Sequence, residues 1–258
     1  MARVGPSAPC RPPAPSVLDD STIPACPFRL RTLGGFELLA WERPVTVAGP
    51  AARVVALSGL RGRLHRDQLA DELWPGALGD RGRAYLRSAL WRLGTLAKGV
   101  VLTQGEMISI APEVQVDATQ LLGWATGVTR DGVATQFPAG LEVGAELLPG
   151  WSDSWLIDYR EQLNVLVPQA LEDVAVARLE QGQPATALWC AMAAHRCDPL
   201  RESAVRILLL VLLEQGNRHR ARLVFTHYRH RLRDELGIEP SPGLARLMAQ
   251  RGGTGGGR

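Results

Sequence analysis

The sequence predicts two successive folds, an α+β winged helix-turn-helix domain and then an all-α, tetratricopeptide-like helical bundle. Residues 27–126 follow the order strands, three helices, hairpin, which is the order of a winged helix with an N-terminal sheet. From Trp151 onward, the apolar residues recur with helical spacing. A repeat that begins at Gly182 begins again at Gly216, and this offset of 34 residues is the period of a tetratricopeptide unit.

The bulk composition allows two domains and says little about function. The chain has 258 residues, and its net charge of +3 neither favours nor excludes nucleic acid. Lys98 is the single lysine among 29 basic residues, and a GC-rich genome explains this use of arginine more simply than selection for binding. No apolar run approaches the roughly 20 residues of a membrane span, so we expect a soluble, cytoplasmic protein.

The cysteines predict neither a disulfide framework nor a metal site. They are Cys10, Cys26, Cys190 and Cys197, and no two of them form a C-x-x-C pair. Cys190 and Cys197 lie seven residues apart on an expected helix, which favours two small buried side chains. We therefore expect no metal.

The first domain is expected over residues 27–126. Apolar alternation and turn residues within Phe28–Val47 predict a small antiparallel sheet. Three helices are expected to follow, at Pro50–Leu60, His65–Trp74 and Arg81–Lys98. Two β-rich runs around Gln104–Glu106 predict the hairpin. A last helix is expected at Asp117–Trp124, with its aspartate as the N-cap.

The remaining segments are expected to be helical or flexible. A Pro-rich leader at 1–26 and a Gly-rich tail at 251–258 predict disorder. Residues 127–150 form a Gly-rich connection that few core contacts should cross. The linker is expected at 127–146 and the helical domain at 147–250. Its helices are expected at Trp151–Gln181, Gln183–Arg196, Leu200–Gln215, Asn217–Leu236 and Pro242–Gln250.

The two repeat units predict the core of the helical domain. Ala187 and Ala221 recur at the position where two helices cross closely. Stacked units bury their apolar faces together. The large residues expected in this core are Trp155, Trp189, Phe225 and Tyr228.

The expected helix at Arg81–Lys98 has one apolar face and one basic face. Its buried stripe is predicted to be Leu86, Ala89, Leu90, Leu93 and Ala97. A helix that follows a helix and a turn can enter the major groove, where arginine pairs with guanine O6 and N7. The hairpin would then lie near the sugar-phosphate backbone. The predicted DNA-contacting residues are Arg81, Arg83, Arg87, Ser88, Arg92, Thr103 and Gln104. A basic face can also be merely solvated, but its position between a helix and a hairpin favours DNA.

A second basic cluster lies on the last long helix. Its members are Arg218, Arg222, Arg229 and Arg233. These side chains could contact phosphate or an acidic partner, and they could equally form a solvated face.

Several strings of the sequence resemble a known family. LRTLGGFEL at 30–38, RDQLADELW at 66–74 and LRSALWRL at 86–93 are similar to the DNA-binding half of the Streptomyces antibiotic regulatory proteins (SARPs). LLPGWSDSWLIDYREQL at 147–163, DPLRESAVRILL at 198–209 and EQGNRHRARLVFTHYRHRLRDELGIEPSP at 214–242 resemble their bacterial transcriptional activator domain (BTAD).

This resemblance implies a DNA-binding transcriptional activator with an OmpR-type winged helix. It implies recruitment of RNA polymerase at promoters with direct repeats, a possible homodimer there, and control of secondary-metabolite genes. Arg87 and Arg92 match basic positions of the family's recognition helix. The sequence departs from the family at Gly94–Thr95, often arginine there, and in the turn PGALGD after Trp74.

Two other functions were weighed against DNA binding. Larger relatives of the family continue into an ATPase, but no G-x-x-x-x-G-K-[ST] motif occurs here, so no nucleotide or other cofactor is expected. An enzyme is not expected, because no spacing links Asp153, Asp158, Glu161 and His195 to a nucleophile, base or metal. The alternative to a DNA-binding regulator is a helical-repeat adaptor whose winged helix binds protein.

Overall fold

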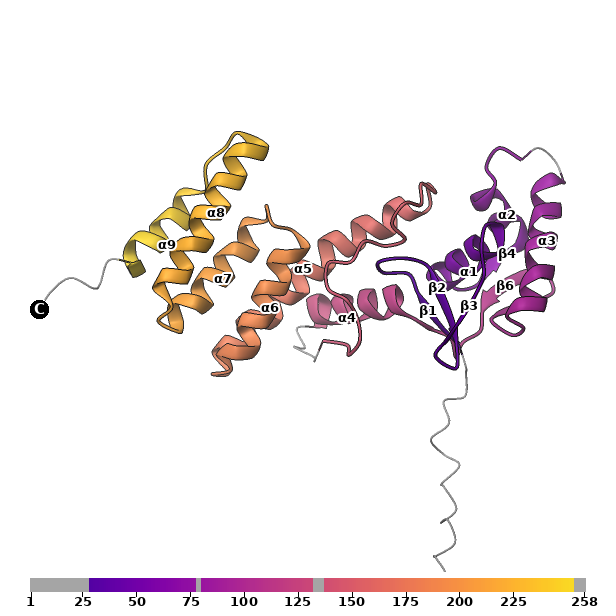
Figure 1. Cartoon of the computed structure of the whole chain (residues 1–258), viewed down its shortest axis with the longest axis horizontal. Coiled ribbons are helices and arrows are strands. Elements are labelled where there is room, and N and C mark those ends of the chain that lie inside the picture. The colour runs from indigo at the N-terminus through magenta and orange to yellow at the C-terminus, as the bar shows by residue number, and fades with distance from the viewer. Residues whose placement is uncertain (1–27, 78–79, 132–136, 253–258) are drawn as a thin grey trace, which may run out of the picture.

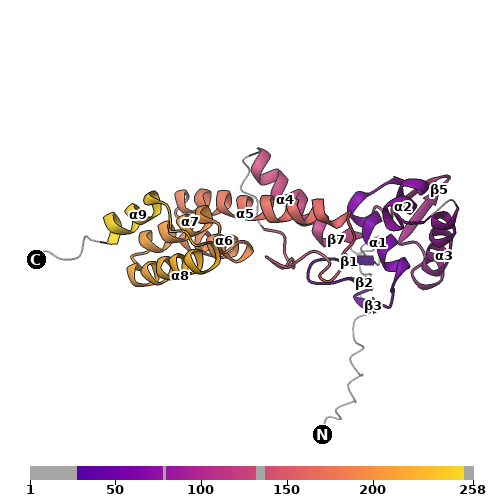
Figure 2. The same cartoon turned by 90° about the horizontal axis from the view of Figure 1, so that it is seen from above.

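The computed structural model describes residues 28–77, 80–131 and 137–252 of the chain. It is elongated, with the strands and α1–α3 at one end and α5–α9 toward the other (Figures 1 and 2). The expected leader at 1–26 lies outside the described residues, as does nearly all of the expected tail at 251–258.

The first sheet contains four strands in the order β3-β2-β1-β7. The strands are β1 (Phe28–Arg31), β2 (Glu37–Ala40), β3 (Arg43–Val45) and β7 (Gln115–Val116). The first three form an antiparallel meander in which Leu30 lies opposite Leu38, and both leucines are buried. β7 pairs in parallel with β1, and sequence reasoning did not foresee it, because two residues are too few to show alternation.

Three helices and a second sheet complete the winged helix. The helices are α1 (Pro50–Arg61), α2 (Arg66–Leu73) and α3 (Arg81–Leu96). The sheet has the order β4-β6-β5, formed by β4 (Leu64–His65), β5 (Val101–Gln104) and β6 (Met107–Ile110). Pro50 is the first residue of α1. Proline is well tolerated there, because the N–H groups of the first turn have no acceptor within the helix and the N–H that proline lacks is not needed. α1 packs against α2, α3 and β6, so it forms the centre of this domain's core.

Helix α4 (Asp117–Asp131) is longer than the sequence predicted, since it was expected to end at Trp124. The apolar spacing continues through Ala125 and Val128, both buried, although Gly123 and Gly127 lower the helical propensity. Asp117 begins the helix, but it bonds to a distant strand: its carboxylate accepts the Thr32 and Leu33 N–H groups at 2.8 and 2.9 Å. α4 packs extensively against α5, which joins the two halves.

The Gly-rich connection was expected to make few core contacts, and this expectation was wrong. Leu147 and Leu148 are fully buried. Leu147 forms a β-bridge with Leu33, and the Leu148 N–H donates to the Thr32 carbonyl at 2.8 Å. The Arg160 guanidinium donates to the carbonyls of Leu147, Leu148 and Trp151, which holds the connection in place.

The helical half consists of one long helix and two helical hairpins. Its helices are α5 (Leu156–Glu180), α6 (Pro184–Cys197), α7 (Glu202–Glu214), α8 (Arg218–Leu236) and α9 (Pro242–Gly252). Ala187 and Ala221 are fully buried at the helix crossings, as expected from the repeat. A left-handed Gly237 ends α8, a conformation that costs glycine little.

The large core residues follow the prediction in part. Trp155 and Tyr228 are buried, and Phe225 is half-buried. Trp189 is 43% exposed and lies outside the core proper, where its ring contacts Phe137 edge-on at 5.4 Å between centroids. The repeat pattern correctly placed Trp189 on a helix. It could not show that Phe137, which belongs to the Gly-rich connection, packs against the ring of Trp189.

Candidate nucleic-acid interface

Helix α3 rests on α1 and α2 through the stripe that the sequence predicted. Leu86, Ala89, Leu93 and Ala97 are buried, whereas Leu90 is only half-buried. At the start of α3, a Cβ added to Gly82 would lie 3.6 Å from the Cβ of Ala70, so the helices approach closely there. The opposite face is therefore fixed by packing and points away from the core.

The outward face of α3 is basic and open to solvent. Arg81, Arg87, Ser88 and Arg92 are all exposed. Among the described residues, neither Arg87 nor Arg92 forms an ion pair. A guanidinium without an internal partner keeps its donors available for phosphate or for the edge of guanine.

Arg83 and Ser88 have internal partners that the sequence did not reveal. Arg83 holds Asp67 of α2 in a bidentate pair, with Nε and Nη2 at 2.6 and 2.7 Å from the two carboxylate oxygens. The hydrogen bond from Arg83 keeps the pKa of Asp67 below its usual value. The Ser88 hydroxyl donates to the Ala84 carbonyl at 3.0 Å, which leaves its lone pairs for an external donor.

A tryptophan at the middle of this face escaped the sequence analysis. Trp91 is 74% exposed and lies between Arg87 and Arg92 along the helix. In the sequence, apolar residues at helical spacing indicate the buried stripe of α3, and Trp91 does not follow that spacing. The signal that could have found it is a large aromatic residue out of phase with its helix. Such exposure is costly in a free protein and typical of a contact surface.

The β5–β6 hairpin lies close to α3, at the end of the molecule remote from α6–α9 (Figure 2). Its turn uses Gly105 with a φ of 59°, which glycine adopts readily. Thr103 and Gln104 are exposed on β5. Glu106 at the turn is 3.8 Å from Arg66, which offsets its negative charge. The structure thus brings the predicted helix and hairpin residues to one end.

The basic cluster on α8 is only partly available. Arg218, Arg222 and Arg233 are exposed, and Arg229 is half-buried. Spacings of four, seven and four residues place the four side chains on one face of the helix. Arg233 forms an ion pair with Glu239, which raises the pKa of this arginine. Sequence reasoning could not show that pair, because Glu239 follows the end of the helix.

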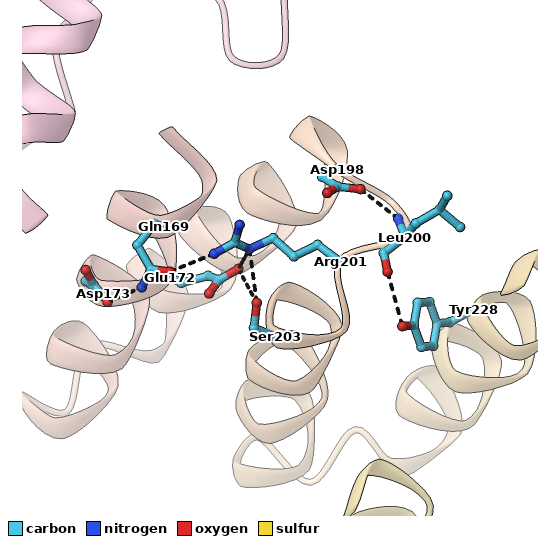
Figure 3. Close-up of polar contacts among 8 residues, drawn as sticks. All are labelled: Gln169, Glu172, Asp173, Asp198, Leu200, Arg201, Ser203 and Tyr228. Carbon is cyan, nitrogen blue, oxygen red and sulfur yellow. Dashed lines mark hydrogen bonds and ion pairs between the residues drawn. The ribbon is translucent and has the colours of Figure 1, made fainter. Parts of the chain in front are cut away.

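The string DPLRES, which carried much of the family resemblance, joins helices of the fold (Figure 3). Glu172 of α5 is buried and accepts from the Arg201 guanidinium at 2.7 Å and from the Ser203 hydroxyl at 2.9 Å. Arg201 also donates to Gln169 at 2.6 Å. Because these hydrogen bonds join side chains of both helices, the network fixes α5 against the start of α7.

The same string also connects α7 to α8 and α9. The Asp198 carboxylate accepts the Leu200 N–H at 3.0 Å, and the Tyr228 hydroxyl donates to the Leu200 carbonyl at 3.2 Å (Figure 3). Glu202 accepts the Ser241 N–H at 2.8 Å, at the start of α9. The hydrogen bonds of this string therefore hold α5, α7, α8 and the start of α9 together.

The two described cysteines are free thiols. Burial raises the pKa values of Cys190 and Cys197 to about 11, so both thiols stay protonated at neutral pH. Cys10 and Cys26 lie outside the described residues. Within the described ranges, no group of three His, Cys, Asp or Glu side chains is placed to hold a metal ion, and no helix is long and apolar enough to cross a bilayer.

The fold defines a class of protein, an OmpR-type winged helix joined to a tetratricopeptide-like helical domain. Residues 132–250 match the family model described as "Bacterial transcriptional activator domain". The regulatory protein AfsR of Streptomyces coelicolor is 34% identical over 103 residues, which cover 40% of this chain and 10% of AfsR. These matches support the resemblance to the SARP/BTAD regulators, a family of transcription factors and not of enzymes.

A solved structure supports the fold across nearly the whole chain. Mycobacterium tuberculosis EmbR, in complex with a low-affinity phosphopeptide, superposes with a TM-score of 0.61 at 18% sequence identity. The match covers 87% of this chain and 65% of that one. The predicted fold class and the family resemblance are confirmed. The chain spans a small part of AfsR and under two thirds of EmbR, so the activities of those proteins are not transferred by these matches.

Proposed function

We propose that the protein activates transcription by binding promoter DNA with α3 in the major groove and the β5–β6 hairpin against the backbone. The observation that carries this proposal is the outward face of α3. There two arginines without an ion pair in the described chain flank an exposed tryptophan, at one end of an elongated molecule.

Within this proposal, the residues of the face divide their roles by chemistry. Arg87 and Arg92 read guanine edges or hold phosphates, since a planar guanidinium can donate two parallel hydrogen bonds. Trp91 lies between them and makes apolar contact with thymine methyl groups or sugars. Arg81, Ser88, Thr103 and Gln104 contact phosphates and set the register.

Arg83 receives a different role from the one that the sequence suggested. Its bidentate pair with Asp67 joins α3 to α2, so it positions the recognition helix. The outer nitrogen of the guanidinium remains free to approach a phosphate, but a base contact would require breaking the pair. We therefore rank Arg83 below Arg87 and Arg92 as a determinant of sequence specificity.

The helical half supplies the activating contacts in this proposal. Tandem helical hairpins offer a broad surface, and the arginine stripe of α8 would suit an acidic patch on RNA polymerase. Two protomers on direct repeats would place two such surfaces side by side. The family favours a role at secondary-metabolite genes, and a regulator of chromosomal promoters would act in the cytoplasm.

Genome-wide footprinting with the purified full chain tests the proposal. The expected result is protection of promoters that contain direct repeats beside a biosynthetic gene cluster. Binding should weaken steeply as salt rises, because each neutralised phosphate releases counterions. A folded protein that protects no promoter, yet retains partner proteins independently of salt, would instead identify a helical-repeat adaptor.

A further inference from the structure

A groove in the helical half has features that DNA binding does not use. It lies between α6 and α8 above α7 and has a volume of about 400 Å³. The buried Leu208 and Leu212 of α7 form its floor, and Leu188 and Val224 form its two walls. The surface inside is mostly apolar, although it opens to water.

The groove follows from the way the hairpins stack. α6 packs on α5 and α7, while α8 packs on α7 and α9. α6 and α8 make few direct contacts with each other, and Met192, itself 46% exposed, lines the gap between them. The apolar side chains that line the groove therefore lack the packing contacts that a closed core would provide.

The rim of the groove is positively charged. Arg196, near the end of α6, and Arg220, in the first turn of α8, both line it, and none of the residues that line it is acidic. No ion pair engages either guanidinium within the described residues, in contrast to Arg231 and Arg233 further along α8. Two imidazoles, His195 and His227, add hydrogen-bonding groups to the same rim.

The dimensions of the groove suit a small molecule. Its lining covers positions 188–196 of α6 and extends from 217 to 227 at α8, which corresponds to roughly 12–15 Å at the helical rise. The volume falls within the range of about 300–1,000 Å³ that small-molecule sites occupy. A docked helix of ordinary length would extend well beyond both ends of this space.

We propose that this groove binds a small organic anion with an apolar body, such as an aromatic or alkyl carboxylate or sulfonate. The body lies on Leu208 and Leu212, and the anionic group lies against an arginine at one end of the groove, Arg196 or Arg220. Such a ligand bridges α6 and α8, so it stabilises the stacking of the two repeat units. The proposal does not depend on DNA binding and is tested without DNA.

The test uses the full chain and two dyes that share an apolar body. Anilinonaphthalene sulfonate carries the anionic group, and N-phenyl-1-naphthylamine is its neutral counterpart. We expect saturable, one-to-one binding of the sulfonate to the folded protein, with a rise in Tm. The double variant Arg196→Gln, Arg220→Gln should weaken sulfonate binding by about tenfold or more and change neutral-dye binding by less than about twofold.

Two further variants separate the groove from the rest of α8. Val224→Asp should abolish binding of both dyes, because it places a carboxylate in the apolar wall. Arg222→Gln, two residues from Arg220 but outside the groove, should leave both unchanged. A cooperative melt shows that each variant is folded. If Val224→Asp does not fold, the glutamine pair still tests the site, since both its arginines are exposed.

Competition identifies the kind of occupant. Decanoate should displace the sulfonate dye. Displacement by an acidic amphipathic peptide alone would make the groove a peptide site and overturn the proposal. Absence of saturable dye binding, or equal binding by the wild type and the glutamine pair, would also overturn it.

Discussion

The arginines in the two halves of the molecule differ in what they contact. On α3, Arg87 and Arg92 extend into solvent with no ion pair in the described chain. In the helical half, Arg201 holds the buried Glu172, and Arg160 donates to three backbone carbonyls. The first pair contributes little to folding and is available for a ligand. Arg160 and Arg201 donate hydrogen bonds to groups within the protein and stabilise the fold.

This difference shows that burial and partners, rather than residue type, decide what an arginine does. In the sequence, the basic residues of α3 form one set with no sign of which are paired. The structure separates Arg83, which is paired with Asp67, from Arg87 and Arg92. Substitutions at these sites therefore give opposite results in stability and binding measurements, and the following experiments use that contrast.

The largest effect is expected on the free energy of unfolding, from loss of the Arg201–Glu172 pair in the helical half. Arg201→Ala should lower the free energy of unfolding by about 3–5 kcal/mol, because it leaves the Glu172 carboxylate buried and unpaired. Urea unfolding measures this loss. Arg231→Ala is the matched control, since its pair with Glu235 is exposed and should contribute less than about 1 kcal/mol. Equal losses in the two variants would show that the network in Figure 3 does not stabilise the fold as described.

The next effect separates the two faces of α3. Leu86→Ala should cost about 2–5 kcal/mol of stability, because this fully buried side chain leaves a cavity. Leu90→Ala should cost less, since Leu90 is only half-buried. Thermal melts of both variants check the order. A larger loss at Leu90 would mean that the helix is rotated relative to the structure described.

Much of the fold could be predicted because its signals are local. Apolar periodicity, glycine punctuation and the 34-residue repeat indicated the helices, the hairpin and the order of the two halves. Long-range contacts could not be predicted in this way. The bonds from Asp117 to Thr32, the burial of Leu148 and the pairing of β7 with β1 each join segments far apart in the chain.

The candidate site was predicted as a set of residue types, without their partners. The buried stripe of α3 follows from spacing, so the outward direction of Arg87 and Arg92 could be inferred. The pairing of Arg83 with Asp67 spans two helices and a turn, and no local pattern encodes it. Trp91 was missed because an apolar residue is expected inside, and only the structure shows how far it is exposed.

A smaller effect is expected on DNA binding. Trp91→Ala should weaken binding to a promoter by about 1–3 kcal/mol if its ring contacts bases, and should leave stability within about 0.5 kcal/mol. Arg83→Ala should weaken binding less than Arg87→Ala, because Arg83 is already paired. Fluorescence anisotropy of labelled promoter DNA, together with a melt of each variant, measures both quantities. A reversed order of the two arginine variants would argue against the role given to Asp67.

The smallest effect is a dependence of stability on pH. The hydrogen bond from Arg83 holds the pKa of Asp67 below its ordinary value. A carboxyl with a lowered folded-state pKa stabilises the protein above its unfolded pKa of about 4, and this stabilisation is lost as the pH falls through the folded value. Asp67→Asn should therefore lower Tm slightly at pH 7 and by less at pH 3. Differences of equal size at both pH values would contradict the sign of this shift.

DNA binding by the full chain with substitutions on α3 tests the central claim most directly. The measurement is the affinity for a footprinted promoter across a salt series, for the wild type, the double variant Arg87→Ala, Arg92→Ala, and Arg246→Ala on α9 as a control. The account predicts tight, steeply salt-dependent binding by the wild type and the control. It predicts a loss of about tenfold or more for the double variant at unchanged Tm. A folded double variant that binds this promoter as tightly as the wild type would contradict the assignment of α3 as the recognition helix.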